Sequence, residues 1–191
     1  ARRMGARGFR TPSVLPTPRP SYISVPFTVT IVHDVPVFDT VAPFYDRVAP
    51  RTDQRPLEAG LQLVERRVED VVDLGGGTGR AARALGGDHV VFDASRPMLE
   101  RARNHDQETV LGDVRRLPFG DGAVDAVISV DAIHHFPDIP SVVEDVYRIL
   151  GTGGAIVVRE FDPTTIRGKG LKLGQHLIGF DCTFYTPDGL A

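Results

Sequence analysis

A carboxylate and four glycines stand close together between Asp73 and Gly79, and this is the stretch of the chain best suited to chemistry. Glycine adopts positive φ readily and carries no Cβ, so a glycine turn lets a ligand approach bare backbone. An apolar β-type pair, Val71-Val72, precedes the turn, and small and apolar residues follow in helical spacing through Leu85. The order of strand, glycine turn and helix predicts a site for a nucleotide-like ligand at the turn.

The spacing of the glycines separates two ligand classes. The dinucleotide fingerprint G-x-G-x-x-G would place its third glycine at Arg80 or Ala82 and would leave the acid at Asp73 without a role. The pattern Asp-x-Gly-x-Gly-x-Gly uses every position: Asp73, Gly75, Gly77 and Gly79. It resembles motif I of the class I S-adenosyl-L-methionine (SAM)-dependent methyltransferases, in which the acid faces the ammonium of the methionine moiety. The same acid would repel the pyrophosphate of a dinucleotide.

Two further acids end the next two expected strands. Asp93 lies roughly 20 residues beyond the glycines, where a strand-end carboxylate meets ribose hydroxyls. Asp113 opens a segment that resembles the Gly-Asp-x-x-x-Leu-Pro-Phe stretch of the same family. The resemblance implies that Asp113 accepts a hydrogen bond from the adenine amino group, that the next backbone amide meets a ring nitrogen, and that Ala94 and Met98 lie against the adenine. A core role for Met98 and a surface role for Asp113 are the alternatives.

Residues 37–46 and 130–138 resemble two segments of one branch of this family, the ubiquinone/menaquinone C-methyltransferase-like (methyltransferase type 11) branch. The first matches its Phe-Asp-x-x-Ala-x-x-Tyr-Asp opening, which in that branch forms a helical lid over the cofactor and substrate. Tyr45 is the candidate functional residue of this segment. The alternative is that Tyr45 is simply buried on an amphipathic helix. The second matches its His-His-Phe/Leu-x-Asp segment. His134, His135 and Tyr45 are candidate general bases, with structural packing as the alternative. Adjacent histidines point apart on a helix and no third histidine or cysteine stands at ligand spacing, so we expect no metal site.

The resemblance implies SAM as the cofactor and a set of residues that bind it. Ser129 and Val130, at the end of the fourth expected strand, would border its methionine end and the transferred methyl group. No single catalytic residue follows, because an in-line displacement chiefly requires alignment of donor and acceptor and removal of water. The implied cofactor-binding residues are Tyr45, Asp73, Gly75, Gly76, Gly77, Gly79, Asp93, Ala94, Met98, Asp113, Val114, Ser129 and Val130.

Strands and helices alternate along the chain, and this alternation must position the three acids. One strand is expected to begin at Val71, and others to cover 89–93, 109–114 and 155–161; a turn and a further strand together occupy 122–129. Two helices are expected over 55–66 and 138–150, a third after the glycine turn and a fourth after Ser95. The pattern predicts an α/β fold, a doubly wound parallel sheet of the Rossmann-like methyltransferase type. Members of the family close with a helix and an antiparallel hairpin. This chain stops at 186–191, where that helix would begin, so we expect the C-terminal hairpin to be missing.

The composition indicates one globular domain and an arm. Residues 1–36 are rich in Arg and Pro and are expected to form a disordered or extended arm, with a targeting peptide as the alternative; residues 37–191 are expected to form the methyltransferase domain, truncated at its C-terminus. Residues 34–191 carry 17 basic against 25 acidic side chains, which argues against a nucleic-acid partner. The single cysteine, Cys182, fits a reducing compartment, and no apolar run is long enough to span a bilayer. We expect a cytoplasmic protein that has a small-molecule substrate, no nucleic-acid partner and no integral membrane segment. The sequence does not indicate the oligomeric state.

The predicted function is SAM-dependent transfer of a methyl group to a small, quinone-like or otherwise lipophilic acceptor. Two alternatives stay open: a non-catalytic relative that binds only the cofactor or a partner, and an NAD-dependent Rossmann oxidoreductase. The acceptor and its reacting atom, carbon, nitrogen or oxygen, also stay open, because one scaffold of this kind serves many substrates.

Overall fold

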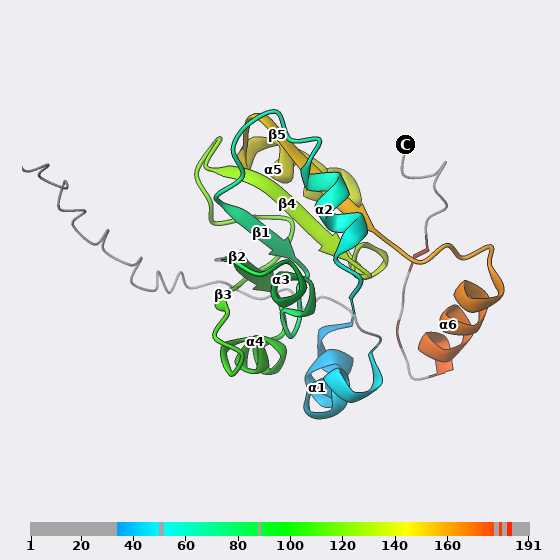
Figure 1. Ribbon diagram of the computed structural model, residues 1–191. Helices are drawn as coiled ribbons and strands as arrows, with labels where there is room; N and C mark the ends of the chain where they lie inside the picture. Colours follow the sequence, from blue (N-terminus) through cyan, green and yellow to red (C-terminus); the bar gives the residue numbers. More distant parts are fainter. Residues whose placement is uncertain (1–33, 50–51, 88, 178–179, 181–182, 185–191) are drawn as a thin grey trace, which may run out of the picture.

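A five-stranded parallel sheet forms the centre of the computed structural model, which describes residues 34–49, 52–87, 89–177, 180 and 183–184. The strands are β1 (Val71–Leu74), β2 (His89–Asp93), β3 (Glu108–Leu111), β4 (Val124–Val130) and β5 (Leu150–Arg159), in the order β3-β2-β1-β4-β5 (Figure 1). The chain runs outward from β1 to β3 and then returns to place β4 beside β1. Ligands of such sheets bind outside the carboxyl ends of the strands where the order reverses, here between β1 and β4. The predicted doubly wound parallel sheet is confirmed.

The two central strands, β1 and β4, are buried along their whole length because their apolar side chains point to both faces. Val72 and Leu74 face α5 (Ile139–Ile149) in one core cluster. Val71 faces the opposite side, which α2 (Arg55–Leu61) and α3 (Arg80–Leu85) cover. Side chains alternate along a strand, so Asp73 shares the face of Val71 and its carboxyl group lies under α3.

The helix α4 (Arg96–Arg103) begins as the sequence predicts. The Ser95 hydroxyl caps it by accepting a hydrogen bond from Met98 N at 3.3 Å, and Pro97 occupies its first turn. Its buried side chains, Met98, Leu99 and Ala102, pack toward the sheet. This packing fixes the loop between β2 and α4 at the carboxyl edge.

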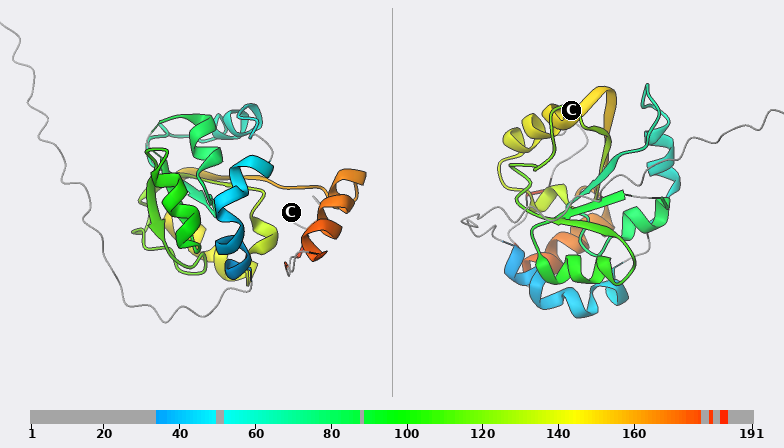
Figure 2. Two further views of the ribbon diagram at one scale, coloured as in Figure 1. Left: turned by 90° about the horizontal axis from the view of Figure 1, so that it is seen from below. Right: turned by 90° about the vertical axis from the view of Figure 1, so that its left-hand side faces the viewer.

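The helix α1 (Val35–Val48) lies beside α4 at the same edge of the sheet (Figure 2). Two aspartates attach it: Asp39 Oδ1 accepts from Ser95 Oγ, and Asp46 Oδ1 accepts from Thr78 Oγ1, both at 2.6 Å. The helix therefore rests directly on the loops that follow β1 and β2. It starts two residues before the predicted domain boundary at 37, and the predicted arm lies, up to residue 33, outside the described residues.

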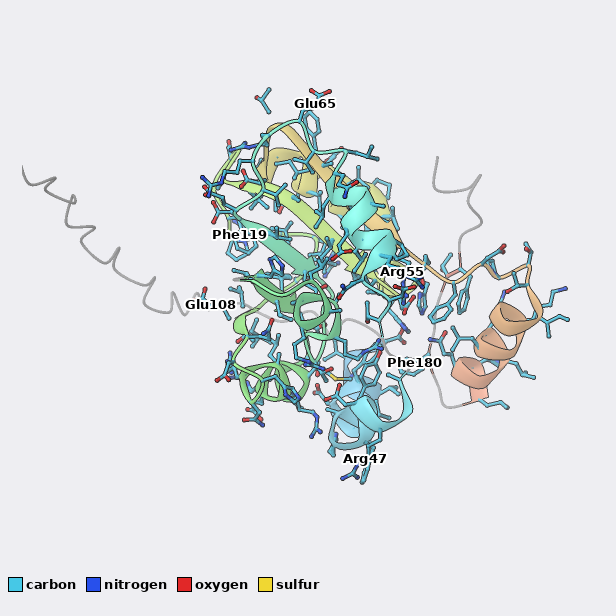
Figure 3. The ribbon with its side chains drawn as sticks, viewed as in Figure 1. Arg47, Arg55, Glu65, Glu108, Phe119 and Phe180 are labelled. Carbon is cyan, nitrogen blue, oxygen red and sulfur yellow. The ribbon has the colours of Figure 1, made fainter. Side chains whose placement is uncertain are left out.

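The helix α6 (Ile166–Leu177) stands apart from the sheet, on the chain that leaves β5. Beyond it the Phe180 side chain, labelled in Figure 3, packs on Phe38 of α1 with ring centroids 4.8 Å apart. Cys182 and the predicted chain end at 186–191 lie outside the described residues. Of the helices that the structure describes, none is long and apolar enough to cross a membrane.

Several element boundaries differ from those predicted. The helix α2 ends at Leu61 rather than 66, because Glu65 N already donates to Gly153 O at 2.9 Å and the chain has turned toward β5. The strand β3 ends at Leu111 rather than 114, because Asp113 Oδ1 accepts from Arg115 N and forms a turn. The strand β5 begins at residue 150 rather than 155, directly after α5, and shifts its register opposite β4.

Candidate functional site

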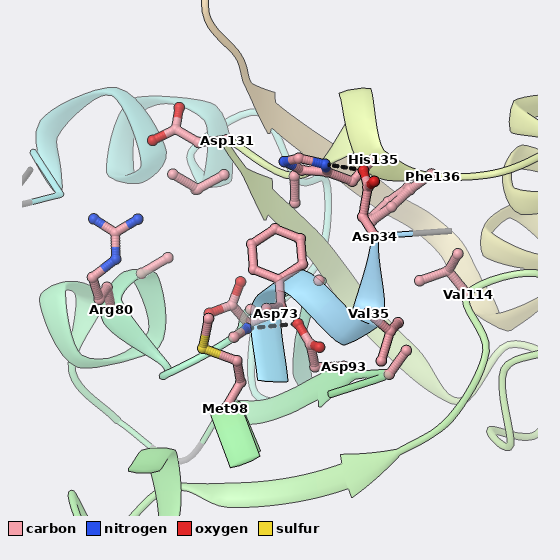
Figure 4. A pocket seen from close by; sticks show the side chains of 18 of the residues that line it. Asp34, Val35, Asp73, Arg80, Asp93, Met98, Val114, Asp131, His135 and Phe136 are labelled. Atoms are coloured by element: carbon pink, nitrogen blue, oxygen red, sulfur yellow. Dashed lines mark hydrogen bonds and ion pairs between the residues drawn. The ribbon is translucent and has the colours of Figure 1, made fainter. Parts of the chain in front are cut away.

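A cavity opens at the carboxyl edge of the sheet, between the loops after β1, β2 and β4 and the helix α1 (Figure 4). It encloses about 830 Å³, counting the part open to solvent. The predicted site residues that line it are Tyr45, Asp73, Gly75, Gly76, Gly77, Asp93, Ala94, Met98, Val114, Val130 and His135.

Asp73 is a completely buried carboxyl group at the floor of this cavity. Its Oδ2 accepts a hydrogen bond from Ala82 N at 3.2 Å, whereas its Oδ1 is buried and has no hydrogen-bond partner within the described residues. Burial raises the pKa of this carboxyl group to about 7, against the opposing Ala82 N–H and with a smaller contribution from the nearby Asp93. A buried carboxylate oxygen without a donor is costly, so the site suits a ligand that brings a positive donor group.

Asp93 is held in place by backbone donors from two loops. Its Oδ2 accepts from Gly77 N at 2.9 Å and its Oδ1 accepts from Ser95 N at 2.8 Å. Burial raises its pKa above the ordinary value, although these hydrogen bonds act in the opposite direction. A carboxylate has further lone pairs, so the fixed Asp93 can also accept from ligand hydroxyl groups.

The glycine turn fits closely around the first carboxylate. A Cβ on Gly76 would lie 2.6 Å from Asp73 Cγ, and a Cβ on Gly75, where φ is +68°, would lie 2.8 Å from Ala132 Cβ. A Cβ on Gly77 would find its nearest neighbour, Asp93 Oδ2, only at 4.0 Å. Space at Gly77 is therefore open beside Asp93, as a ligand laid along the turn would require. The Asp73 Oδ1 without a hydrogen-bond partner suits the ammonium group of SAM, and the open space at Gly77 beside Asp93 suits its ribose.

Four predicted site residues do not line the cavity: Gly79, Asp113, Ser129 and His134. Gly79 stands directly before α3 and has a φ of +75°. A Cβ at this position would lie 3.2 Å from the Val91 side chain, so Gly79 faces the core. The carboxylate of Asp113 forms an ion pair with the Arg115 guanidinium, which lowers its pKa. Ser129 is buried and donates to Leu74 O at 3.0 Å. The expected convergence of three acids is thus found for two, and the cofactor roles of Asp113 and Ser129 stay predictions.

The two histidines have different surroundings. The His134 ring is fully buried, with Nδ1 at 2.9 Å from Glu160 Oε1 and Nε2 at 3.1 Å from Gln175 Nε2. His135 lines the cavity, with Nδ1 at 2.6 Å from Asp34 Oδ2. Burial and the neighbouring His134 lower the pKa of His135 to about 4, against the opposing Asp34, so its ring is neutral near pH 7. Of the two histidines, only His135 lines the cavity.

The phenol of Tyr45 lines the cavity and stays protonated at neutral pH. Burial raises its pKa, and the charge of Arg80 only partly offsets that effect. A phenol with a raised pKa donates a hydrogen bond but is a poor base. Within the described residues no group of three or more His, Cys, Asp or Glu side chains is arranged to hold a metal ion.

Sequence reasoning missed part of the lining. Phe38 belongs to the recognised Phe-Asp segment, and Arg80 and Asp131 each directly follow a predicted site residue, so proximity to the motifs was the available signal. Asp131 adopts φ +55° and forms an ion pair with Arg159. The missed lining residues are Asp34, Val35, Phe38, Thr52, Arg80, Ala81, Asp131, Ala132, Phe136 and Pro137.

Comparison with known proteins identifies the family. The methyltransferase domain family Methyltransf_11 matches residues 72–158. The demethylmenaquinone methyltransferase of Thermus thermophilus is 33% identical over 154 residues, which are 71% of this chain and 69% of that protein. The chain belongs to the class I SAM-dependent methyltransferases. This methyltransferase also has a fold close to that of a SAM-dependent methyltransferase of Thermotoga maritima, described as a possible histamine N-methyltransferase: the TM-score is 0.69, the identity 25%, and the match covers 83% of this chain and 77% of the other.

A further relative is named for a different class of molecule. The probable tRNA methyltransferase 9B of Homo sapiens is 30% identical to this methyltransferase over 132 residues, which are 66% of this chain but only 28% of that protein. The absence of a nucleic-acid partner therefore stays a prediction, as does the cytoplasmic location. The predicted family and branch are confirmed, and the glycine spacing was correctly assigned to a methyltransferase rather than to an NAD-dependent oxidoreductase.

Proposed function

We propose that this methyltransferase binds SAM in the cavity at the carboxyl edge of its sheet and transfers the methyl group to a small, fairly apolar, quinone-like acceptor. The observation that carries the proposal is the carboxyl group of Asp73: this residue lines the cavity, and its Oδ1 is buried and has no hydrogen-bond partner within the described residues. An ammonium group is the donor that such an oxygen requires.

The cofactor roles divide between the two ends of the cavity. Asp73 would pair with the amino group of the methionine moiety, and Asp93 would accept from the ribose hydroxyls beside the open turn at Gly77. Met98 and Val114 would lie against the adenine; Asp113 would join them only if Arg115 released its carboxylate. Bound SAM supplies an electrophilic methyl group on its sulfonium. The chain's part is to align this group with the acceptor and to exclude water.

The acceptor end of the cavity is lined by aromatic and apolar side chains. Phe38 of α1 lies with its ring centroid 4.8 Å from that of His135, and Phe136 and Ala132 complete this wall. Such a wall favours a flat, weakly polar molecule, and the Thermus relative acts, by its name, on demethylmenaquinone. His135 is the candidate general base for a carbon or oxygen acceptor: its ring lines the cavity and is neutral near pH 7, and its lowered pKa makes it a weak base. The protonated Tyr45 would donate a hydrogen bond.

An incubation of the complete gene product with methyl-labelled SAM tests this proposal. Demethylated quinones, other small phenols and a fractionated cell extract are offered in parallel, and labelled products are identified by mass spectrometry. We expect label in a small lipophilic product. Label only in tRNA or protein would refute the acceptor class, and protection of the fold by NAD but not by S-adenosylhomocysteine would refute the cofactor.

A further inference from the structure

The helix α6, which stands apart from the sheet in Figures 1 and 2, carries an exposed apolar stripe. The stripe consists of Ile166, Leu173 and Leu177, which are 91%, 61% and 75% exposed. These residues follow one another at intervals of seven and four, so they lie on one side of the helix, within about 40° of each other. Large aliphatic side chains aligned in this way on a surface helix indicate a site that binds something apolar.

Basic side chains accompany this stripe. Lys169 and Lys172 are the only lysines of the chain, both are exposed, and residues 166–177 contain no acidic residue although the chain has a net charge of −3. The nearest acid before the helix, Asp162, accepts two hydrogen bonds from the threonine two residues later. The ammonium of Lys172 lies 5.9 Å from the ring centroid of Phe184 and keeps its access to solvent. Because a lysine has a long apolar stem, its ammonium reaches polar groups beside a buried stripe.

The opposite side of α6 is attached to the acceptor end of the cavity. Gln175, about 180° around the helix from the stripe, places its Nε2 at 3.1 Å from His134 Nε2. Just beyond the helix, the ring of Phe180 lies 5.0 Å from that of His135 and 4.8 Å from that of Phe38, measured between centroids. The stripe therefore faces outward from an element that packs on the aromatic wall of the cavity.

We infer that α6 lies on the surface of a membrane that contains anionic lipids, with its apolar stripe at the boundary of the acyl chains and Lys169 and Lys172 beside the lipid phosphates. The charge of the helix decides for a lipid surface, because amines without neighbouring acids on the helix complement phosphate groups. Three aliphatic side chains are also far fewer than the roughly 20–30 residues a side of a stable protein interface.

This inference concerns a surface outside the cavity and rests on the proposed function in one point only, the lipophilic character of the acceptor. A lipophilic acceptor dissolves in the membrane. Docking through α6 would then bring the wall formed by Phe38 and His135 close to the phase that holds the acceptor.

The test is co-sedimentation of the full chain with vesicles, without cofactor or acceptor. Vesicles of phosphatidylcholine are compared with vesicles that also contain about 30% phosphatidylglycerol, and we expect at least tenfold stronger binding to the latter, weakened by high salt. Replacing both leucines of the stripe, Leu173→Gln with Leu177→Gln, should lower this binding more than tenfold. Lys169→Gln and Lys172→Gln should each lower it about fivefold. Glutamine keeps a helix propensity close to that of leucine and lysine.

A matched control is the double change Val143→Gln with Tyr147→Gln on α5, where the two side chains are 57% and 82% exposed and have the same spacing as the two leucines. This variant should bind the vesicles like the unaltered chain. The Arg-rich residues 1–33 are identical in all variants, so any contribution from them cancels in the comparison.

Four results would overturn the inference: no vesicle binding by the unaltered chain, equal binding to neutral and anionic vesicles, full binding by the variant without the two leucines, or self-association that this variant abolishes. The last result would assign the stripe to a second copy of the chain. None of these results bears on methyl transfer to an acceptor offered in solution, so failure of the inference and failure of the proposed function are distinguishable.

Discussion

Asp73→Asn should make the ligand-free protein more stable while abolishing cofactor binding. The Asp73 side chain is completely buried, with one backbone donor on Oδ2 and none on Oδ1 within the described part of the chain. Burial raises its pKa from 3.8 to about 7. Between these two pH values the folded state holds a proton that the unfolded chain has released, so folding carries a penalty that the amide of Asn avoids.

The size and the sign of the effect follow from this shift. The folded-state pKa lies above the unfolded value, so the penalty is absent below about pH 4, grows by about 1.4 kcal/mol per pH unit, and is constant above about pH 7. Its full size corresponds to about 4 kcal/mol, which is an upper bound because the Asn amide also needs partners. The stability difference between Asp73→Asn and the unaltered chain should therefore increase in favour of the variant from pH 4 to pH 7.

Urea unfolding followed by circular dichroism at pH 5, 6, 7 and 8, without cofactor, measures this difference. A matched control is Asp125→Asn: Asp125 is also buried, but backbone donors from Asp70 and Glu69 and the Arg66 guanidinium lower its pKa, so its loss should destabilise the fold. A stability difference for Asp73→Asn that does not change with pH, or a variant less stable than the unaltered chain at pH 8, would refute the reasoning.

Three further outcomes are expected. The affinity for S-adenosylhomocysteine should rise about tenfold per pH unit up to pH 7 and then level off, because Asp73 must lose its proton to pair with the ammonium; calorimetry should find no such rise in Asp73→Asn. Gly76→Ala should weaken this binding more than tenfold and destabilise the fold by about 1–3 kcal/mol, because the new Cβ meets the Asp73 carboxyl group, whereas Gly170→Ala, with open space around it, should do neither. Ser95→Ala should lower the free energy of unfolding by about 1–2 kcal/mol, because it removes both the cap of α4 and the hydrogen bond to Asp39; a change below about 0.3 kcal/mol would contradict this.

The sheet could be predicted from the sequence because its strands carry unambiguous signals. The runs that became β1 and β4 are largely apolar on both faces, which is typical of buried strands of a parallel sheet. The helix α6 was not predicted, because Gly168, Gly170 and Gly174 disfavour a helix. Element ends also shifted where a contact distant in sequence decides them, such as the bond from Glu65 N to Gly153 O.

The candidate site could be predicted only in part, for a related reason. Asp73 and Asp93 line the cavity as expected, because an acid at the end of a parallel strand is placed by the fold itself. Asp113 does not line it, because the orientation of its carboxylate is set by the Arg115 guanidinium two residues away. The guanidinium of Arg80 lies over the ring of Tyr45, a residue far away in the sequence that the docking of α1 brings near. Local patterns locate the loops, but the packing decides which side chains face the ligand.

A crystal structure of the chain with S-adenosylhomocysteine tests the central claim most directly. We expect the ligand in the cavity between β1, β2 and α1, with its ammonium nitrogen within about 3.2 Å of Asp73 Oδ1 and its ribose hydroxyls on Asp93. A ligand bound elsewhere, or one in this cavity that leaves Asp73 Oδ1 without a donor, would contradict the account.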